Sequence, residues 1–286
     1  MKHFLIITNS FKDKNLKLTK EIKAYIEEKG GSCIFFTSTG EEPKNAAPEA
    51  VDIPKETECA IVLGGDGTLI RAASKLVDSN LPLIGVNMGT LGYLCELEES
   101  GVFHAIDQLM EDAYIMEERL MLQGYALKKN ESTPKKIALN DVVIHRTGAL
   151  SVVNLIVSVN GEYLNTFNAD GVIISTPTGS TGYSMSAGGP IVDPKAKMIL
   201  ITPINAHNLN AKSIVIEADD EVMIEIGARR FQKDETVEVS YDGDDAVKLE
   251  VGDKIIIRRA DATAHICKLS KESFLEILRK KMQTYA

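Results

Sequence analysis

A short glycine-rich loop between an apolar strand and an apolar helix constrains the fold of this chain more than any other feature. Residues 60–63 are four consecutive apolar residues, typical of a buried strand, and Gly64-Gly65-Asp66-Gly67-Thr68 follows directly. Residues 68–77 then have the apolar spacing of a helix, and residues 83–86 form another short apolar run. A strand, a helix and a second strand at this spacing predict a parallel sheet.

The same loop predicts a binding site for an anion. Its glycines allow positive φ and a close approach of the backbone to a ligand, and the following helix offers unpaired N–H groups and a positive dipole end. The loop lacks the Lys-Ser/Thr ending of a Walker A motif and the G-x-G-x-x-G pattern of a dinucleotide fingerprint. Asp66 lies where a carboxylate would repel phosphate. Two interpretations stay open, because Asp66 is either a functional group or an ordinary turn or N-cap residue.

Residues 1–112 read as an α/β domain with a Rossmann-like parallel sheet. Its other expected elements are strands at 4–7 and 33–36, helices at 18–28 and 102–112, and an exposed loop at 37–55 that holds three prolines. Ligands of such sheets bind beyond the carboxyl ends of the strands. We therefore expect the Asp66 loop and residues 87–90 to lie at one binding edge.

Residues 113–262 predict a mostly β, sandwich-like second domain. The hydrophobic period there changes to two, and residues 156–163 indicate a hairpin with an Asn160-Gly161 turn. Further strands are expected at 222–226, 236–239 and 254–258. In residues 263–286, apolar side chains from Phe274 to Leu278 recur at helical spacing, so we expect a C-terminal helix that packs back onto one of the domains.

Composition narrows the classes of function. The chain has 286 residues, of which 44% are hydrophobic and 26% charged, and these values are typical of a globular protein. Its net charge of -9 argues against DNA or RNA as the main partner. The four cysteines show neither zinc-site spacing nor a disulfide pattern, and we expect buried thiols. No secretion signal or membrane-spanning run is found, which indicates a cytoplasmic protein.

Four segments carry more polar chemistry than a fold requires. They are the Asp66 loop, the segment 87–94 (Asn-Met-Gly-Thr-Leu-Gly-Tyr-Leu), the pair Asn140-Asp141, and residues 170–184, a strand that runs into a loop crowded with hydroxyls. Hydroxyls, amides and exposed N–H groups suit the recognition of a base, a ribose and a diphosphate. Each segment alone also has an ordinary structural explanation as a loop, a cap or packing.

Taken together, these four segments resemble the NAD kinase family over roughly residues 60 to 245. The long run Asp-Gly-Val-Ile-Ile-Ser-Thr-Pro-Thr-Gly-Ser-Thr-Gly-Tyr-Ser, followed by Gly188-Gly189-Pro190, is the most specific part. The Gly-Gly-Asp-Gly-Thr loop is shared with diacylglycerol and sphingosine kinases. The chain departs from the family pattern at Tyr93, Asp141 and Gly182, where the family often has Phe, Glu and Ala.

The resemblance implies an enzyme that transfers a phosphoryl group from ATP or polyphosphate to the 2′-hydroxyl of the adenosine ribose of NAD, giving NADP. Asp66 would be the catalytic base, and Mg²⁺ or another divalent cation would be the cofactor, with unknown ligands on the protein. Donor phosphates would contact Gly65, Gly67, Thr68 and Arg71. The dinucleotide would contact Asp66, Gly67, Asn140, Asp141, Asn168, Asp170, Thr178, Thr181, Gly182, Tyr183, Ser184, Met185, Ser186 and Asp244. The resemblance also implies a homodimer or homotetramer.

Two alternatives remain open from the sequence. A lipid kinase of the diacylglycerol type would share the Asp66 loop, but the hydroxyl-rich residues 175–184 suit a polar dinucleotide better. A catalytically silent NAD(H) sensor would have no use for a carboxylate at the ribose hydroxyl. The donor, the preference between NAD and NADH, and feedback by NADP are left undetermined.

Overall fold

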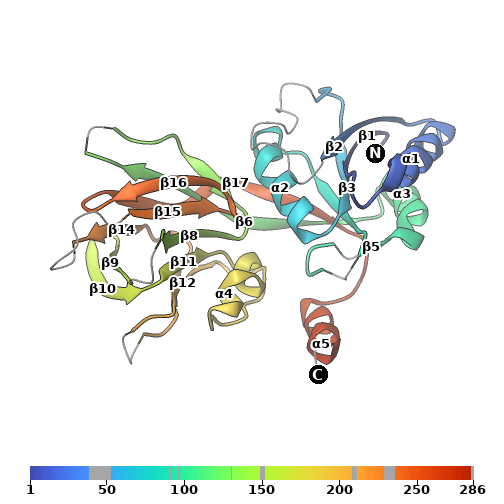
Figure 1. The fold of residues 1–286 in the computed structure, drawn as a ribbon. Helices are drawn as coiled ribbons and strands as arrows, with labels where there is room; N and C mark the ends of the chain where they lie inside the picture. Colours follow the sequence, from blue (N-terminus) through green and yellow to red (C-terminus); the bar gives the residue numbers. More distant parts are fainter. Residues whose placement is uncertain are drawn as a thin grey trace. The chain divides into compact units, whose positions relative to one another are not determined.

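The chain folds as two compact units in the computed structural model (Figure 1). The structure describes residues 1–38, 53–89, 92–95, 97–129, 131–148, 152–207, 211–228 and 236–284. Unit 1 comprises Met1–Arg119 and Ala262–Ala286, and unit 2 comprises Leu120–Asp261. Strands β6 (Ile115–Leu127) and β17 (Lys254–Lys268) run from one unit into the other.

Unit 1 is built on a parallel sheet, as predicted. Its strands are β1 (His3–Asn9), β2 (Ser32–Ser38), β3 (Cys59–Gly64) and β4 (Leu83–Asn87), in the order β2-β1-β3-β4. The short β5 (Leu97–Glu98) lies beside β4, and Ile266 of β17 pairs with Leu83. The register pairs Thr8 with Leu63 and Gly64 with Asn87. The carboxyl ends of β1, β3 and β4 therefore lie at one edge.

Helices cover both faces of this sheet (Figure 1). Helices α1 (Lys17–Glu28) and α3 (Val102–Met110) share one core with the sheet, to which they contribute Ile22, Ile26, Val102, Ile106 and Leu109. Helix α2 (Asp66–Leu76) covers the other face and buries Leu69, Ala72, Ala73 and Leu76. The predicted helices begin or end within two residues of these bounds, since apolar periodicity marks a helix better than its ends.

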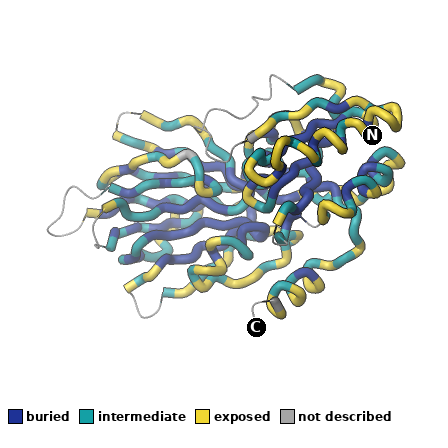
Figure 2. Tube along the Cα trace, turned by 45° about the vertical axis from the view of Figure 1, so that its right-hand side comes forward, coloured by how far each residue is buried: buried dark blue, intermediate teal, exposed yellow. Residues whose placement is uncertain are grey.

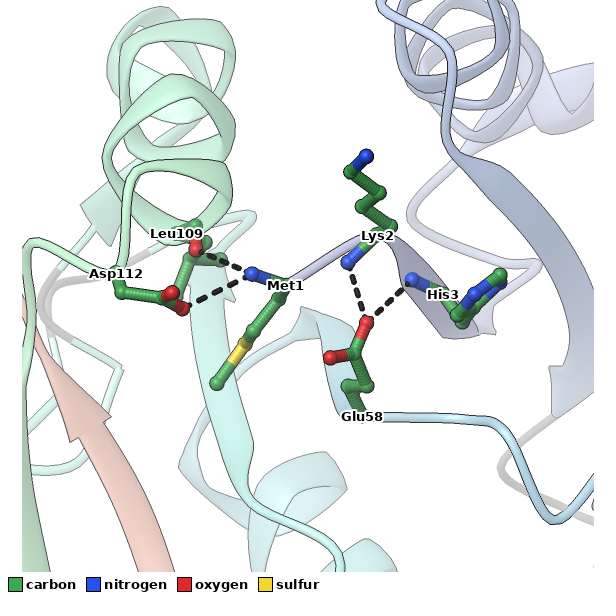
Figure 3. Close-up of polar contacts among 6 residues, drawn as sticks. All are labelled: Met1, Lys2, His3, Glu58, Leu109 and Asp112. Carbon is green, nitrogen blue, oxygen red and sulfur yellow. Dashed lines mark hydrogen bonds and ion pairs between the residues drawn. The ribbon is translucent and has the colours of Figure 1, made fainter.

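Polar contacts fix the N-terminus of unit 1 (Figure 3). The amino group of Met1 donates to the carbonyl oxygen of Leu109 at 3.2 Å and to Asp112 Oδ1 at 2.9 Å. The carboxylate of Glu58 accepts the backbone N–H groups of Lys2 and His3. These bonds hold the start of β1 beside the start of β3, so the two strands enter the sheet in register.

Unit 2 is a sandwich of antiparallel strands, as predicted. One sheet has the order β13-β12-β11-β8-β15-β16, and the other places β10, β9, β14 and the first part of β17 side by side. The bounds are β7 (Lys136–Ala138), β8 (Asp141–Arg146), β9 (Val153–Val159), β10 (Glu162–Ala169), β11 (Gly171–Ser175), β12 (Met198–Ile204), β13 (Ile214–Glu217), β14 (Val222–Gly227), β15 (Thr236–Tyr241) and β16 (Asp244–Glu250). Strand β6 pairs with β7.

The two sheets of unit 2 enclose one hydrophobic core. Phe167, Val172, Ile224 and Ile255 are fully buried members of that core, and the buried strands are dark blue in Figure 2. The β9–β10 hairpin turns at Asn160 and Gly161, whose φ angles of 50° and 82° are those of a two-residue turn with both residues left-handed. The predicted Asn-Gly turn is confirmed.

Two expectations about loops change: the loop after β11 contains short helical turns, and the loop at 37–55 lies largely outside the described residues. The hydroxyl-rich loop after β11 contains a 3-10 turn, Thr178–Thr181, and the one-turn helix α4 (Tyr183–Ser186). Most of the loop expected at 37–55 lies outside the described residues. The C-terminal helix is α5 (Phe274–Thr284). All four cysteines are buried free thiols, as expected. Among the described residues, no helix is long and apolar enough to cross a membrane.

Candidate active site

The Gly-rich loop of unit 1 connects the carboxyl end of β3 to the start of α2. Gly65 is the N-cap of α2 and provides no side chain to cap it, so the first N–H groups of the helix are left for other partners. A Cβ on Gly64 would lie 2.4 Å from Oγ1 of Thr68, so a glycine is needed where the helix folds back over the strand. Gly67 has no atom within 4 Å of where a Cβ would stand and is exposed.

The carboxylate of Asp66 is held by three consecutive backbone N–H groups. Tyr93 donates to Oδ2 at 2.6 Å, and Leu94 and Cys95 donate to Oδ1 at 3.1 and 3.0 Å. Asp66 is the first residue of α2 and not its N-cap, so the N-cap interpretation is wrong. A carboxylate offers about four lone-pair positions. Oδ1 accepts two of these N–H groups and Oδ2 accepts one, so Oδ2 is the less occupied of the two oxygens.

Two neighbours make this arrangement of Asp66 specific. A Cβ on Gly92 would lie 1.8 Å from Oδ1 of Asp66, so no larger residue fits there without moving the carboxylate. The thiol of Cys95 is buried beside it. Burial, and then the negative charge of Asp66, raise the pKa of Cys95, so the thiol stays protonated. Asp66 is therefore surrounded by donors within its own unit.

Lys12 is a residue at this loop that the sequence interpretation missed. Its Nζ would lie 3.1 Å from a Cβ on Gly65 and 3.6 Å from one on Gly89. Lys12 follows β1, whose carboxyl end lies at the same edge as the Gly-rich loop. Its side chain is exposed, and it forms no ion pair within the described part of the chain. The rule that ligands bind at strand carboxyl ends is the signal that points to Lys12.

Other polar groups lie on the same sheet edge or on the first turns of α2. Thr68 is 8% exposed, and Arg71 is half-buried one turn further along the helix. Asn87 donates its Nδ2 to the carbonyl oxygen of Gly89 at 2.9 Å, while its Oδ1 is buried without a hydrogen-bond partner. Oγ1 of Thr8 is also buried without one. Buried unsatisfied polar atoms at one edge are a feature of ligand sites.

In unit 2, Asn140 and Asp141 lie against the segment that follows β11. The carbonyl oxygen of Asn140 accepts the N–H of Thr176 at 2.9 Å. A Cβ on Gly182 would lie 3.4 Å from Nδ2 of Asn140 and 4.0 Å from Oδ2 of Asp141. Oδ1 of Asn140 and Oγ1 of Thr178 are buried and without hydrogen-bond partners. The structure thus brings Asn140, Asp141 and Gly182 together.

Asp141 has an altered protonation equilibrium. Burial, followed by the negative charge of Asp242, raises the pKa of Asp141 from its usual 3.8 to about 7. Near neutral pH the carboxyl group is therefore a mixture of charged and neutral forms. A group that titrates in this range beside unsatisfied polar atoms is a candidate for ligand binding.

The residues predicted between 178 and 186 differ in exposure. Tyr183 is 47% exposed and Met185 is 38% exposed, and Ser186 is also exposed. Ser184 is fully buried, and its hydroxyl lies 3.1 Å from that of Thr202. Thr181 Oγ1 donates to the carbonyl oxygen of Thr178 at 3.3 Å. Tyr183 and Met185 thus present apolar surface to solvent, whereas Ser184 supports the segment from beneath.

Asp170 and Asn168 lie apart from the Asn140 group. Strand β11 pairs Ser175 with Asp141 at one end and Gly171 with His145 at the other, so Asp170, just beyond Gly171, is roughly 17 Å away at about 3.3 Å per residue. Asp170 accepts from Arg146 Nε at 2.7 Å and from Asn205 Nδ2 at 3.0 Å, and these bonds lower its pKa. Asn168 accepts from Asn154 Nδ2 at 3.1 Å. The sequence alone does not show this separation.

Asp244 begins β16 opposite Tyr241 and is half-buried. The preceding residue pair, Asp242-Gly243, makes the turn itself, with φ angles of 50° and 79°. It is Asp242, not Asp244, whose carboxylate contacts the Asn140-Asp141 backbone, at 2.7 and 3.1 Å. The sequence interpretation missed Asp242 because a turn aspartate has no distinguishing local signal.

Comparison with known proteins decides the family. Residues 4–114 match the ATP-NAD kinase N-terminal domain, and residues 139–269 match the ATP-NAD kinase C-terminal domain. The chain is 57% identical to the NAD kinase of Agathobacter rectalis, with all of both chains covered. The chain belongs to the NAD kinase family. It is 42% identical to the NAD kinase of Lachnospira eligens, over 99% of this chain and 100% of that protein.

Solved structures of NAD kinase family members share the fold. Yeast NADH kinase complexed with NADH superposes with a TM-score of 0.85 at 23% identity, covering 99% of this chain and 88% of that one. An NAD kinase from Archaeoglobus fulgidus in complex with ATP gives 0.77 at 20% identity, covering 98% of each chain.

Membership in the NAD kinase family makes the chain an enzyme, a kinase that acts on NAD. The resemblance inferred from the four motifs is thereby confirmed. The family excludes the lipid kinase and the silent sensor as functions of this chain.

Proposed function

We propose that the chain transfers the γ-phosphoryl group of ATP to the 2′-hydroxyl of the adenosine ribose of NAD, with Asp66 as the base. The observation that carries this proposal is the fixed carboxylate of Asp66, which accepts three backbone N–H groups, two of them on Oδ1 and one on Oδ2. A carboxylate held in this way can orient a hydroxyl without rotating away from it.

The reaction balances with this single base. The 2′-oxygen forms a bond to the γ-phosphorus while the bond from that phosphorus to the bridging oxygen breaks, and ADP leaves with the electron pair. Asp66 Oδ2 accepts the hydroxyl proton and later releases it to water. Because phosphoryl transfer has a loose transition state, little proton transfer is needed early, and Asp66 chiefly orients the nucleophile.

Donor phosphates bind at the start of α2 in this proposal. Gly65, Gly67 and Thr68 offer backbone N–H groups at a helix N-terminus, where the dipole favours negative charge. Two cations complement them. Arg71 lies on the first turns of α2, and the Lys12 ammonium lies beside Gly65 and Gly89. Both would offset the repulsion between the donor phosphates and Asp66.

The dinucleotide contacts are assigned by motif position and supported by the local geometry. Asn140 and Asp141 accept and donate to the ligand beside Gly182, and Tyr183 packs against a base. Asp170 interacts with the nicotinamide half, in keeping with its distance from Asp141 along β11. The remaining assigned contacts are Asp66, Gly67, Asn168, Thr178, Thr181, Ser184, Met185, Ser186 and Asp244.

A divalent cation, Mg²⁺ or a similar ion, is the proposed cofactor. The described residues contain no group of three or more His, Cys, Asp or Glu side chains that would hold a metal on their own. The chemistry still fits Mg²⁺, which is commonly bound through one or two carboxylates, substrate phosphates and water. The donor phosphates and water would hold the ion, because the Asp66 carboxylate is assigned to the 2′-hydroxyl. When bound, the ion would neutralise charge on the donor phosphates.

The setting and assembly are also proposals. The net charge of -9 disfavours nucleic acid as a partner. The four cysteines are buried free thiols and not disulfides, which supports a cytoplasmic enzyme. The family resemblance supports a homodimer or homotetramer, with the β-rich unit as the interface.

A coupled assay tests the function. The purified chain is incubated with NAD, Mg²⁺ and either ATP or polyphosphate, and NADP is detected with a dehydrogenase that accepts only NADP. We expect NADP with ATP, and none when ATP or the protein is omitted. With NADH in place of NAD the product is NADPH, which is detected with a reductase that oxidises only NADPH, and the two rates give the preferred acceptor. Formation with polyphosphate alone would contradict ATP as the donor, and no NADP with either donor would contradict the proposed reaction.

A further inference from the structure

The carboxylate of Asp242 accepts the backbone N–H groups of three consecutive residues, 139–141. The carboxylate of Asp66 accepts three consecutive N–H groups in unit 1 in the same way. Oδ2 of Asp242 accepts from Leu139 at 2.7 Å, and its Oδ1 accepts from Asn140 at 2.7 Å and from Asp141 at 3.1 Å. In return, the N–H of Asp242 donates to the carbonyl oxygen of Asp141 at 3.0 Å. Four hydrogen bonds thus join the β15–β16 turn to the start of β8.

The turn that carries Asp242 is built for this contact. Asp242 and Gly243 both have positive φ, as a two-residue hairpin turn requires, and Asp is among the few residues that tolerate this conformation. Strands β15 and β8 are paired through Tyr241 and Val142. Asp242, the first residue after β15, is therefore placed opposite the segment that enters β8.

The held segment faces the group assigned to the dinucleotide. The carbonyl oxygens of Leu139 and Asn140 accept from Thr176, at 2.7 Å from its Oγ1 and 2.9 Å from its N–H. With its N–H groups bonded to Asp242 and these carbonyls bonded to Thr176, the backbone has little freedom. The side chains of Asn140 and Asp141 are then directed toward Gly182.

We propose that Asp242 is a positioning residue of the dinucleotide site, which fixes the Leu139–Asp141 backbone and so sets the direction of the Asn140 and Asp141 side chains. The proposal rests on the assignment of these two side chains to NAD. Asp242 itself touches no reacting atom in this account.

The charge of Asp242 adds a second effect. Among the described residues, Asp242 is the charged group that acts on Asp141, while β11, the other neighbour of β8, places the neutral Ser175 opposite it. Burial is the larger cause of the raised pKa of Asp141, and the charge of Asp242 adds to it. Removing that charge lowers the pKa of Asp141, so Asp242 also influences the pH at which this carboxyl group ionises.

Asp242→Asn separates positioning from a purely structural role. Asn tolerates the left-handed backbone, but its amide has one acceptor oxygen and would face at least one N–H group with its own NH₂. We expect the KM for NAD to rise about tenfold, in line with the loss of a hydrogen bond to a charged group, while kcat changes less than about threefold. The inflection near pH 7 in NAD affinity should move to lower pH. Loss of fold stability alone would not move it.

Asp220→Asn is the matched control. Asp220 is also a turn carboxylate of unit 2 that accepts a backbone N–H, from Glu217 at 2.9 Å, and it is remote in sequence from the assigned contacts. We expect it to leave the KM for NAD and its pH profile unchanged. An unchanged KM and an unchanged inflection in Asp242→Asn would overturn the proposal.

A second readout keeps the proposal testable if the reaction itself has been assigned wrongly. Titration of the Asp141 carboxyl carbon by NMR needs neither substrate nor turnover. We expect its pKa to be lower in Asp242→Asn than in the wild type and unchanged in Asp220→Asn. Wild-type protein that forms no NADP would contradict the proposed function, whereas an Asp141 pKa that does not move would contradict the role of Asp242.

Discussion

Gly92 and Asp66 are in such close contact that a Cβ on Gly92 would lie 1.8 Å from Oδ1 of the Asp66 carboxylate. The three N–H groups that bind Asp66 follow directly after Gly92 in the chain. Residues 92–95 therefore position the proposed base. Gly92 leaves space for the Asp66 carboxylate, and the three N–H groups that follow bind it; this arrangement is named the Asp66 seat.

Gly92→Ala tests this seat. The added methyl group forces the Asp66 carboxylate to move, so we expect kcat to fall about 10²-fold or more, in the range that general-base catalysis contributes. Steady-state kinetics with NAD and ATP measure the loss. Gly101→Ala, at a position with no atom within 4 Å, is the control and should keep its activity. A Gly92→Ala enzyme with wild-type kcat would contradict the importance of the seat.

Lys12→Ala tests the proposed contact with the donor. The ammonium beside Gly65 and Gly89 is expected to bind phosphate, so its loss should raise the KM for ATP roughly tenfold and leave the KM for NAD within about twofold. Kinetics at fixed saturating NAD give the value. Lys14→Ala removes an exposed lysine two residues away and should change neither constant. Equal effects of the two substitutions would rule out a specific role for Lys12.

Asp141→Asn is expected to stabilise the fold while weakening NAD binding. The pKa of Asp141 is raised from 3.8 to about 7, so the folded state holds a proton more tightly than the unfolded chain does. Between pH 4 and 7 stability therefore falls as pH rises, by about 4 kcal/mol in total. Asn removes this cost. The unfolding free energy of the Asp141→Asn variant, measured by urea unfolding, should exceed that of the wild type at pH 8 but not at pH 4.

The same substitution is expected to weaken NAD binding, although it stabilises the fold. If the ionised Asp141 accepts ligand hydroxyl groups, wild-type NAD affinity should fall as pH drops below about 7, and Asp141→Asn should lose that dependence. Calorimetric titrations at pH 6 and pH 8 measure both. NAD affinity in the wild type that does not vary between these pH values would exclude Asp141 as an ionising ligand contact.

Tyr183→Ala tests the apolar surface next to α4. Tyr183 is 47% exposed although its side chain is large and aromatic, as expected for a residue that stacks on the adenine ring of a ligand. Stacking acts equally in the ground and transition states, so the KM for NAD should rise, by an amount equivalent to roughly 1–3 kcal/mol, more than kcat falls. Tyr163→Ala, at a 65% exposed tyrosine in the β9–β10 hairpin, is the control. An unchanged KM would place Tyr183 outside the pocket.

The parallel sheet and the sandwich were predictable because their signals are local. Strand β3, from Cys59 to Gly64, is buried throughout, as its apolar sequence predicts. The Asn160-Gly161 turn has the backbone that its residue types favour. The predicted domain boundaries at residues 112 and 262 stay predictions; β6 begins at Ile115, just after the first boundary, and β17 contains the second.

The contacts that organise the candidate site were not predictable in the same way. Asp242 bonds to Asn140 across 102 positions in the chain, and only the register of β15 on β8 brings them together. Asp66 reaches residues 27 to 29 positions away. Lys12 belongs to no motif. Residue type and spacing identified the polar groups, whereas their partners depend on tertiary pairing that a single sequence does not encode locally.

Asp66→Asn is the decisive variant for the role of Asp66 as the base in transfer to the 2′-hydroxyl. The amide is close to the carboxylate in size but cannot take the proton, a role worth ~10²–10⁴-fold, and its NH₂ also replaces one of the two oxygens that accept backbone N–H groups. Turnover of NAD with ATP and Mg²⁺ is measured alongside calorimetric NAD binding, which shows that the variant is folded. We predict NAD affinity near that of the wild type and a rate at least about a hundredfold lower. A variant that binds NAD and keeps more than about a tenth of the wild-type rate would contradict that role.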